Sequence, residues 1–344
     1  MGTDIRTTDA RVDERRVPVH ELLDMIFQAV QAQALAVAAE LGIPDLLKGG
    51  PRRSDELAAA TGSCASTLER LLRLLAHMGV VAESGGGQFT CTTLGRLLQA
   101  GGEHSLRDYA RLTNRGMVLQ IVAQLRQSIQ SGKNQYEVLH GSSFYAALQD
   151  MPGESAIFNG AMREISQQDT LVMLGSYDFS NCKTLVDVGG GQGFLLGSLL
   201  DRYPDLRAVL FDLPDVVGGI DKGLAPHISS ERCRVVAGNF LQGVPPGADV
   251  YLLKRVLSHC SDDEARALLS NIRAVIAPAG RLLVADPGPG TLYGASYDLL
   301  MLVLLGGGLR SDEELRALFG AARFNHVRAI ETPGELRLVE ATAA

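Results

Sequence analysis

The glycines near the middle of the chain are the residues whose type and spacing most suggest chemistry. Residues 185–193 read LVDVGGGQG, and the apolar run FLLGSLL follows directly. A β-branched run that ends in glycines and opens into an apolar helix predicts a strand, a tight turn and a helix N-terminus. Free N–H groups and the helix dipole at such a terminus suit an anionic ligand group. The spacing is G-x-G-x-G, one residue tighter than the dinucleotide fingerprint.

Asp212 supplies the second half of this pattern. It ends the next apolar run, Ala208-Val209-Leu210-Phe211, about 20 residues after the glycines. A carboxylate at this distance usually accepts hydrogen bonds from a ribose diol. A glycine-rich turn alone can serve packing only, but the turn and Asp212 together favour an adenosine-type cofactor.

The C-terminal half alternates short apolar runs with helical segments, one of them predicted over Glu264–Ile276. This alternation predicts a parallel, doubly wound α/β sheet of the Rossmann type, with ligands at the carboxyl ends of its strands. The runs predicted as strands are Thr184–Val188, Ala208–Leu213, Arg234–Ala237, Val250–Leu253 and Arg281–Ala285.

The tail departs from this alternation. Val327–Glu331 and Leu336–Val339 flank Pro333-Gly334, which predicts a hairpin and therefore an antiparallel last strand. Just upstream, Ser311 and Glu314 have the spacing of a capping box, which predicts the start of a helix.

The N-terminal third is predicted to be helical. Apolar residues recur at helical spacing over Glu21–Leu47, and Pro44 breaks the pattern. Two short helices follow, Ser54–Gly62 with its serine as cap and Ser66–Gly79, and then a hairpin over 80–92. This order is typical of a winged helix-turn-helix. It leaves two interpretations, a DNA-binding regulator or a module buried in a subunit interface.

The side chains of the second short helix favour the interface. A recognition helix needs side chains for phosphates and base edges, and residues 66–79 offer only Glu69, Arg70, Arg73 and His77. We therefore expect a homodimer and no nucleic-acid partner. A gel shift with random duplex DNA at low salt would separate the two interpretations.

Length and composition limit the number of domains and the kinds of partner that the chain can have. The chain has 344 residues, 46% of them hydrophobic, enough for about two domains with sizeable cores. A net charge of −7 argues against a nucleic-acid surface built on bulk charge. The five cysteines are scattered without C-x-x-C spacing, which predicts reduced thiols in a cytoplasmic protein and no metal site. Residues 1–16 lack the apolar region of a signal peptide, and Leu299–Leu305 is too short to span a membrane.

Short motifs in a fixed order carry a resemblance to a known family. They are FNGAM with Ser166 over 158–166, DVGGGQG over 187–193, FDLP over 211–214, GNF over 238–240, Lys254 with SDD over 261–263, and GGGLRS over 306–311. Together they resemble the plant caffeate and bacterial natural-product O-methyltransferases, over about residues 20–342. That family transfers the methyl group of S-adenosylmethionine (SAM) to a small-molecule acceptor. The resemblance implies a Rossmann-like methyltransferase domain and a winged-helix dimerisation domain.

The implied domain division has four segments. We expect a disordered N-terminus over 1–18 and a winged-helix-like dimerisation domain over 19–105. A helical connector with acceptor-pocket helices is expected over 106–178, and the SAM-binding domain over 179–344.

The resemblance also assigns a cofactor site. Gly189 and Gly191 are expected to face the methionine part of SAM, and Ser166 its carboxylate. Asn239 and Phe240 are expected to flank the adenine, with Asn239 where the family has Asp; its carbonyl keeps an acceptor for the adenine amino group. The full predicted set is Ser166, Asp187, Gly189, Gly191, Asp212, Leu213, Asn239, Phe240 and Lys254.

The chain departs from the family at the catalytic residues. The family usually reads K-x-x-L-H-D-W-S-D-E, with the His as general base, whereas residues 254–263 read KRVLSHCSDD. Ser258 therefore occupies the base position, and His259 takes the place of the usual Asp. Of the two supporting acids, Asp286 matches the first, and Leu309 stands where a Glu is expected. The candidate catalytic residues are His259, Ser258 and Asp286.

These departures leave the chemistry open. O-methylation is favoured, but a hydroxyl of high pKa needs a base. C- or N-methylation by positioning alone is the alternative, because holding an aligned nucleophile near an activated methyl supplies much of the acceleration. A SAM-binding homologue with other chemistry also fits. Phe158, Met162, Asp298 and Met301, near Tyr297, are predicted to line the acceptor pocket, although each could equally be plain core.

Overall fold

The computed structural model describes residues 18–344, so nearly all of the predicted disordered segment lies outside the described residues. The chain divides into two compact units, Met1–Arg96 and Leu97–Ala344. This division does not test the four predicted segments, which stay a prediction.

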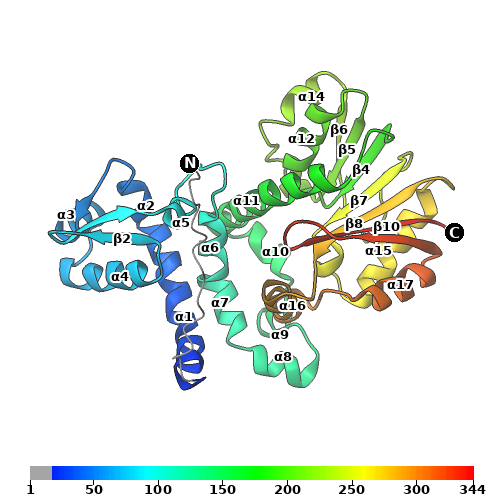
Figure 1. Cartoon of the computed structure of the whole chain (residues 1–344). Helices are drawn as coiled ribbons and strands as arrows, with labels where there is room; N and C mark the ends of the chain where they lie inside the picture. Colours follow the sequence, from blue (N-terminus) through cyan, green and yellow to red (C-terminus); the bar gives the residue numbers. More distant parts are fainter. Residues whose placement is uncertain (1–17) are drawn as a thin grey trace, which may run out of the picture. The chain divides into compact units, whose positions relative to one another are not determined.

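The first unit combines one long helix, α1, and several short helices with a small antiparallel sheet of strand order β1-β3-β2 (Figure 1). The order of helix, helix and hairpin agrees with the sequence, while the winged-helix assignment itself stays a prediction. The elements are α1 (Pro18–Glu40), α2 (Ile43–Leu46), β1 (Arg52–Arg53), α3 (Ser54–Thr61), α4 (Ala65–His77), β2 (Val81–Ser84), β3 (Gln88–Cys91) and α5 (Thr93–Arg96).

The structure differs from the prediction in two details of this unit. The break in the first helical segment lies at Gly42, whose left-handed φ of 65° ends the helix, and Pro44 sits in the first turn of α2, where proline is tolerated. Ser54 is not the cap of α3. Arg53 precedes the helix instead, and its N–H donates to the Glu56 carboxylate at 2.8 Å.

The second unit begins with helices. The predicted break at residues 152–153 is the start of the longest of them, α11, because proline suits the first turn of a helix. These helices are α6 (Arg107–Thr113), α7 (Gly116–Val122), α8 (Leu125–Ser131), α9 (Gln135–His140), α10 (Phe144–Gln149) and α11 (Pro152–Ser176).

A seven-stranded sheet follows, in the order β6-β5-β4-β7-β8-β10-β9. The strands β4 to β8 run parallel, and β10 pairs antiparallel with both β8 and β9. The antiparallel last strand agrees with the hairpin predicted from the sequence near the end of the chain. The doubly wound α/β fold is confirmed. The strands are β4 (Thr184–Val188), β5 (Arg207–Asp212), β6 (Cys233–Ala237), β7 (Val250–Lys254), β8 (Arg281–Pro287), β9 (Phe324–Ile330) and β10 (Leu336–Ala343).

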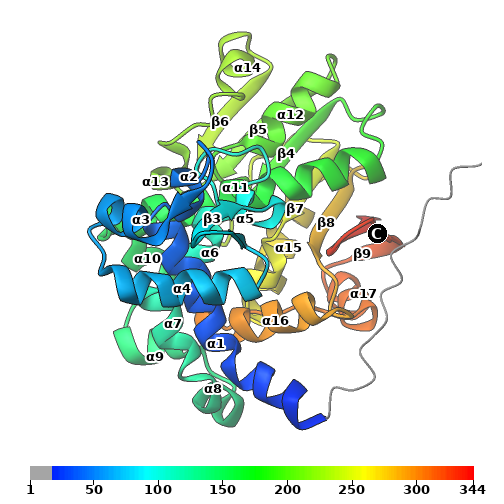
Figure 2. The ribbon, with the colours of Figure 1, turned by 60° about the vertical axis from the view of Figure 1, so that its left-hand side comes forward.

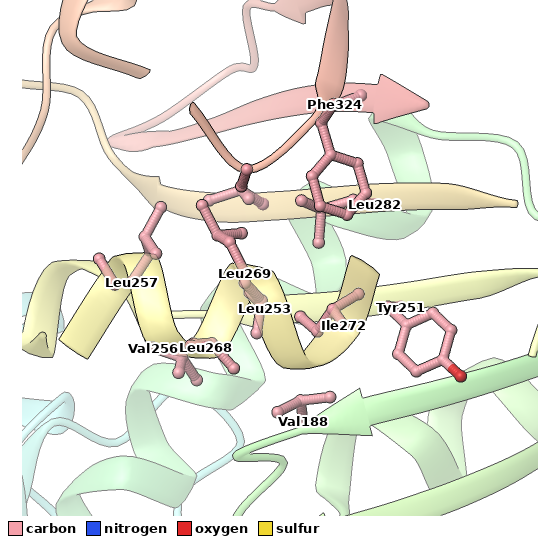
Figure 3. Close-up of a cluster of buried hydrophobic side chains, with 14 of the residues drawn as sticks. Val188, Tyr251, Leu253, Val256, Leu257, Leu268, Leu269, Ile272, Leu282 and Phe324 are labelled. Atoms are coloured by element: carbon pink, nitrogen blue, oxygen red, sulfur yellow. The ribbon is translucent and has the colours of Figure 1, made fainter. Parts of the chain in front are cut away.

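Two layers of apolar side chains cover the faces of this sheet. The ribbon in Figure 2 shows the helices of the second unit beside its strands. Side chains alternate along each strand, so in β7 Tyr251 and Leu253 face α15 and α17, while Val250 and Leu252 face α11 and α12. Figure 3 shows the layer under α15. The remaining helices are α12 (Phe194–Arg202), α13 (Pro214–Val217), α14 (Ala225–Ser229), the 3-10 turn η1 (Leu257–His259), α15 (Asp262–Val275), α16 (Leu292–Leu305) and α17 (Asp312–Ala321).

Candidate active site

The glycine loop connects the end of β4 to α12. Gly189, Gly191 and Gly193 have φ values of 72°, 63° and 87°, a left-handed conformation that favours glycine. A Cβ on Gly189 would lie 2.6 Å from Cγ2 of Val256, whereas a Cβ on Gly191 would meet no atom within 4 Å. The loop is therefore packed on the protein side at Gly189 and open at Gly191, where a ligand can approach the backbone.

Asp212 ends β5 beside this loop. Its Oδ2 accepts a hydrogen bond from the Gly191 N–H at 2.8 Å, and its Oδ1 accepts one from the Leu213 N–H at 2.7 Å. Burial raises the pKa of this carboxyl, and the two N–H donors oppose that shift. The glycine loop and Asp212, paired in the sequence by spacing alone, are thus in direct contact. The ribose contact of Asp212 stays a prediction.

Asp187 is fully buried in β4, and neither of its carboxylate oxygens has a hydrogen-bond partner among the described residues. Burial raises its pKa to about 7; Asp212 adds to the shift, and Lys254 opposes it. Burying a carboxylate without a partner is costly. Asp187 therefore lacks a hydrogen-bond donor among the described residues, although the charge of Lys254 acts on it.

The other predicted cofactor residues surround the same strand ends. Ser166 lies in α11 and is 9% exposed. Asn239 already accepts a hydrogen bond from the Leu241 N–H at 2.9 Å, and its carbonyl oxygen keeps a second lone pair for a ligand. Phe240 packs against the apolar layer under α15. Lys254 ends β7, and burial lowers the pKa of its ammonium, against the charges of Asp169 and Asp187.

A cavity of about 50 Å³ lies among α6, α10, α11 and α16. Phe158, Met162 and Met301 line it as predicted, together with Tyr297. Asp298 is not among the lining residues, because its carboxylate turns away and accepts a hydrogen bond from the Leu309 N–H at 2.5 Å. The lining residues are Tyr109, Leu112, Thr113, Val118, Phe144, Tyr145, Phe158, Met162, Ile165, Arg255, His259, Tyr297, Leu300, Met301, Leu304 and Leu305.

His259 lies in the wall of this cavity between two tyrosines. Its Nδ1 is 2.7 Å from the Tyr145 hydroxyl, and its Nε2 is 2.9 Å from the Tyr297 hydroxyl. Burial, together with the charges of Arg255 and Lys254, lowers its pKa to about 3. The imidazole is therefore neutral, and both of its nitrogens are engaged.

Ser258 and Asp286 form a second pair behind this wall. The Ser258 hydroxyl donates to Oδ1 of Asp286 at 2.6 Å and lies 3.4 Å from the Tyr297 hydroxyl. Ser258 is 1% exposed. Burial raises the pKa of Asp286 to about 6, and the Ser258 hydrogen bond opposes that shift. Asp286 is part of β8, which extends two residues beyond the predicted Ala285 because it pairs with β10.

The sequence interpretation missed Arg255. Its φ of 52° is unusual for a residue other than glycine. Its guanidinium binds both oxygens of Asp169 in α11, at 2.6 and 3.1 Å, and donates to the Tyr293 hydroxyl at 3.3 Å. It also lies 5.4 Å from the centre of the Tyr297 ring. The partners of Arg255 are distant in the sequence, so no local spacing predicts them. Tyr145 is equally distant from His259 in the sequence and could not be predicted either.

Comparison with known proteins gives consistent matches. The O-methyltransferase domain model matches residues 122–325, and the O-methyltransferase dimerisation domain model matches residues 23–101. The mitomycin biosynthesis 6-O-methyltransferase of Streptomyces lavendulae is 36% identical, covering 94% of this chain and 95% of the relative. Phenazine O-methyltransferase PhzM of Lysobacter antibioticus is 36% identical, covering 93% and 95%.

The crystal structure of LaPhzM superposes on this chain with a TM-score of 0.89 at 35% identity, covering 95% of this chain and all of the other. Among the curated relatives are both O- and N-methyltransferases. Similar solved structures contain SAM or its demethylated product, S-adenosylhomocysteine.

Proposed function

Since the chain belongs to the O-methyltransferase family, whose members depend on SAM, we propose that it methylates an aromatic hydroxyl of a small secondary metabolite. The observation that carries this proposal is the position of residues 254–259. Val256 packs against Gly189 of the glycine loop, while Arg255 and His259 line the cavity. One short segment therefore borders both the cofactor loop and the acceptor cavity.

The residues around the glycine loop fit SAM. Asp187 places a buried carboxylate without a hydrogen-bond partner beside the glycine loop, and Gly191 leaves the backbone open to a ligand. Asp212 stands at the strand end where a ribose is usually bound. When bound, SAM supplies an activated methyl group and takes the electron pair of the broken carbon–sulfur bond. Transfer to a hydroxyl therefore releases one proton, which the protein must accept.

The chemistry of the cavity's lining, rather than its volume of about 50 Å³, supports an aromatic acceptor. Its lining is mostly aliphatic and aromatic, with tyrosine hydroxyls and His259 as its polar groups. Pockets of this kind bind flat apolar ligands and orient them by a few polar contacts. Relatives named for hydroxybenzoate and naphthoate acceptors support the same class.

N-methylation is the second candidate. The family's His is Ser258 here, its second supporting acid is Leu309, and the low pKa of His259 makes it a weak base. A neutral amine carries a free lone pair and needs no base, so these substitutions favour a nitrogen acceptor over a weakly acidic phenol.

Labelled SAM separates the two candidates. The purified protein is incubated with methyl-labelled SAM and a panel of hydroxynaphthoates, hydroxybenzoates, aminohydroxybenzoates and aromatic amines. Products are identified by mass spectrometry, and the labelled atom is located by NMR. Label on oxygen supports the proposed function, and label on nitrogen alone supports the second candidate.

SAM binding is expected to depend on Asp212. The change Asp212→Ala removes charge-assisted hydrogen bonds worth roughly 1.5–3 kcal/mol each, so SAM affinity measured by calorimetry should fall at least about tenfold. Asp215→Ala, at an exposed position three residues along, should leave the affinity within about twofold. Equal affinities in the two variants would remove Asp212 from the cofactor site.

We also propose that the chain is a homodimer. The first unit matches a dimerisation domain, and the helix α1 carries many exposed apolar side chains. Among the described residues α1 is also the one helix long and apolar enough to cross a membrane, which is weak evidence for a span. A second copy of the chain covers the same side chains. They are Val19, Leu22, Leu23, Met25, Ile26, Phe27, Val30 and Val37.

Light scattering should find a dimer at micromolar concentration. Placing a charge at Ile26 or Phe27, which are 62% and 58% exposed, should convert it to a monomer. Each loses roughly 1.5–3 kcal/mol of apolar burial in the interface, and the double variant I26D/F27D should weaken association at least about 100-fold. Leu292→Asp is the control, because Leu292 is exposed on the second unit. A monomeric wild type would contradict the proposal.

A further inference from the structure

Hydrogen bonds connect the acceptor cavity to a buried carboxylate. They run from Tyr145 to His259 at 2.7 Å, from His259 to Tyr297 at 2.9 Å and from Tyr297 to Ser258 at 3.4 Å. The last, from Ser258 to Asp286, is 2.6 Å long. Tyr145, His259 and Tyr297 line the cavity, while Ser258 and Asp286 lie behind them.

Donor and acceptor counting fixes the direction of these bonds. An ionised carboxylate only accepts, so Ser258 donates to Asp286, and its single proton is then used. The Ser258 oxygen must accept from Tyr297, whose own proton is used in turn. Tyr297 can then only accept from His259, which places the imidazole proton on Nε2. Nδ1 is left as an acceptor, and Tyr145 donates to it.

This direction leaves one lone pair free at the oxygen of Tyr297, a residue that lines the cavity. Building on the proposed O-methylation, we propose that Tyr297 accepts the proton of the acceptor hydroxyl and that Ser258 relays a proton onward to Asp286. The acceptor proton moves to the Tyr297 oxygen, the former Tyr297 proton moves to the Ser258 oxygen, and the former Ser258 proton moves to Oδ1 of Asp286. Tyr297 and Ser258 end unchanged, and Asp286 carries the one proton that methyl transfer releases.

The environments of the groups support these roles. Burial raises the pKa of Tyr297, so Tyr297 passes a proton on rather than losing one to solvent. Asp286 is a far stronger base than the neutral His259, because burial raises the pKa of the carboxyl to about 6 and lowers that of the imidazole to about 3. His259 is therefore a positioning residue that holds Tyr297 through its Nε2–H.

A second cavity gives the proton a way out. It measures about 10 Å³, lies beside Asp286 and is also lined by Gly308, Arg310 and Arg337. This is roughly the room that one water needs. The charges of Arg255 and Arg310 favour the ionised carboxylate, which helps to restore Asp286 after each turnover. The titratable or charged groups facing Asp286 are Lys254, Arg255, Cys260, Tyr297, Arg310 and Arg337.

The change Tyr297→Phe tests the relay, because it keeps the ring and removes only the hydroxyl. For the hydroxyl acceptor with the highest turnover in the labelled-SAM panel, kcat should fall about 100-fold or more, with SAM affinity unchanged. Asp286→Asn should lose as much, and the double variant little more than either alone, because both break one path. Tyr251→Phe removes another buried tyrosine hydroxyl, outside this network, and should keep full activity.

Two readouts exclude a merely structural effect. The wild-type rate should fall as the pH drops below about 6, where Asp286 becomes protonated, and Asp286→Asn should lack this limb. The loss in Tyr297→Phe should also shrink when the panel acceptor carries a nitro group that acidifies its hydroxyl. If Tyr297→Phe slows O-methylation less than threefold, the relay is contradicted while the proposed function stands. A panel without any O-methylated product overturns the proposed function and the relay together.

Discussion

Replacing Asp169 by alanine is expected to lower the free energy of unfolding by about 3–5 kcal/mol. The Asp169 and Arg255 side chains are 6% and 9% exposed, and they form two hydrogen bonds to each other. Removing the carboxylate leaves a guanidinium buried without its counter-charge, which costs more than the pair contributes. Urea unfolding followed by tyrosine fluorescence measures the change, because the chain has no tryptophan.

Two further variants define this effect. Asp263→Ala breaks the ion pair between Arg266 and Asp263, whose side chains are 54% and 96% exposed, and should leave the unfolding midpoint unchanged within error. The double variant D169A/R255M removes both buried charges and should recover much of the lost stability. Equal losses in the single and double variants would show that Arg255 is not left unpaired by the first change.

Replacing Asp187 by asparagine is expected to stabilise the protein without SAM at pH 8, by about 2–4 kcal/mol. The pKa of this carboxyl rises from 3.8 to about 7 on burial, which corresponds to roughly 4 kcal/mol. Between these values the folded protein keeps a proton that the unfolded chain releases, so stability falls as the pH rises. The opposing charge of Lys254 and the repulsion from Asp212 are already part of this shift.

Urea unfolding between pH 4 and pH 8 measures the dependence. The wild type should lose stability across this range more steeply than Asp187→Asn, and the two should converge near pH 4. On the proposed role of Asp187 in the cofactor site, SAM should stabilise the wild type more than the variant. Parallel curves for the two proteins would contradict the assignment of Asp187 as an unpaired carboxylate.

Local sequence patterns predicted the framework of the site well. The strand, turn and helix around the glycines follow from nearest neighbours, and the contact between Gly191 and Asp212 follows from the fixed geometry of adjacent parallel strands. The predicted capping box at Ser311 is equally local and is present, and the structure has a second one at Ser261. Each of these features depends on a period or a spacing that a sequence displays directly.

The chemistry of the cavity could not be predicted in the same way. Arg255 reaches Asp169 and His259 reaches Tyr145 across long sequence separations, so no spacing connects them. Alignment with the family gave Ser258 its position but not its partner, because its hydrogen bond to Asp286 depends on how far β8 extends. Asp298 is predicted for the pocket from its proximity to Tyr297 in the sequence, but such proximity does not determine which way a helical side chain points, and its carboxylate binds the Leu309 N–H.

The tight packing of Ser258 also limits which substitutions this site can accept. Its oxygen lies 2.6 Å from Asp286 and 3.4 Å from Tyr297, and a Cβ on Gly307 would come within 2.3 Å of its carbonyl. Because Ser258 is buried between these two groups, an imidazole at position 258 would overpack the site, and overpacking a buried site is destabilising. We therefore expect substitutions at 258 and 297 to be non-additive in stability and activity. A histidine at position 258 should be tolerated better when position 297 carries a smaller side chain.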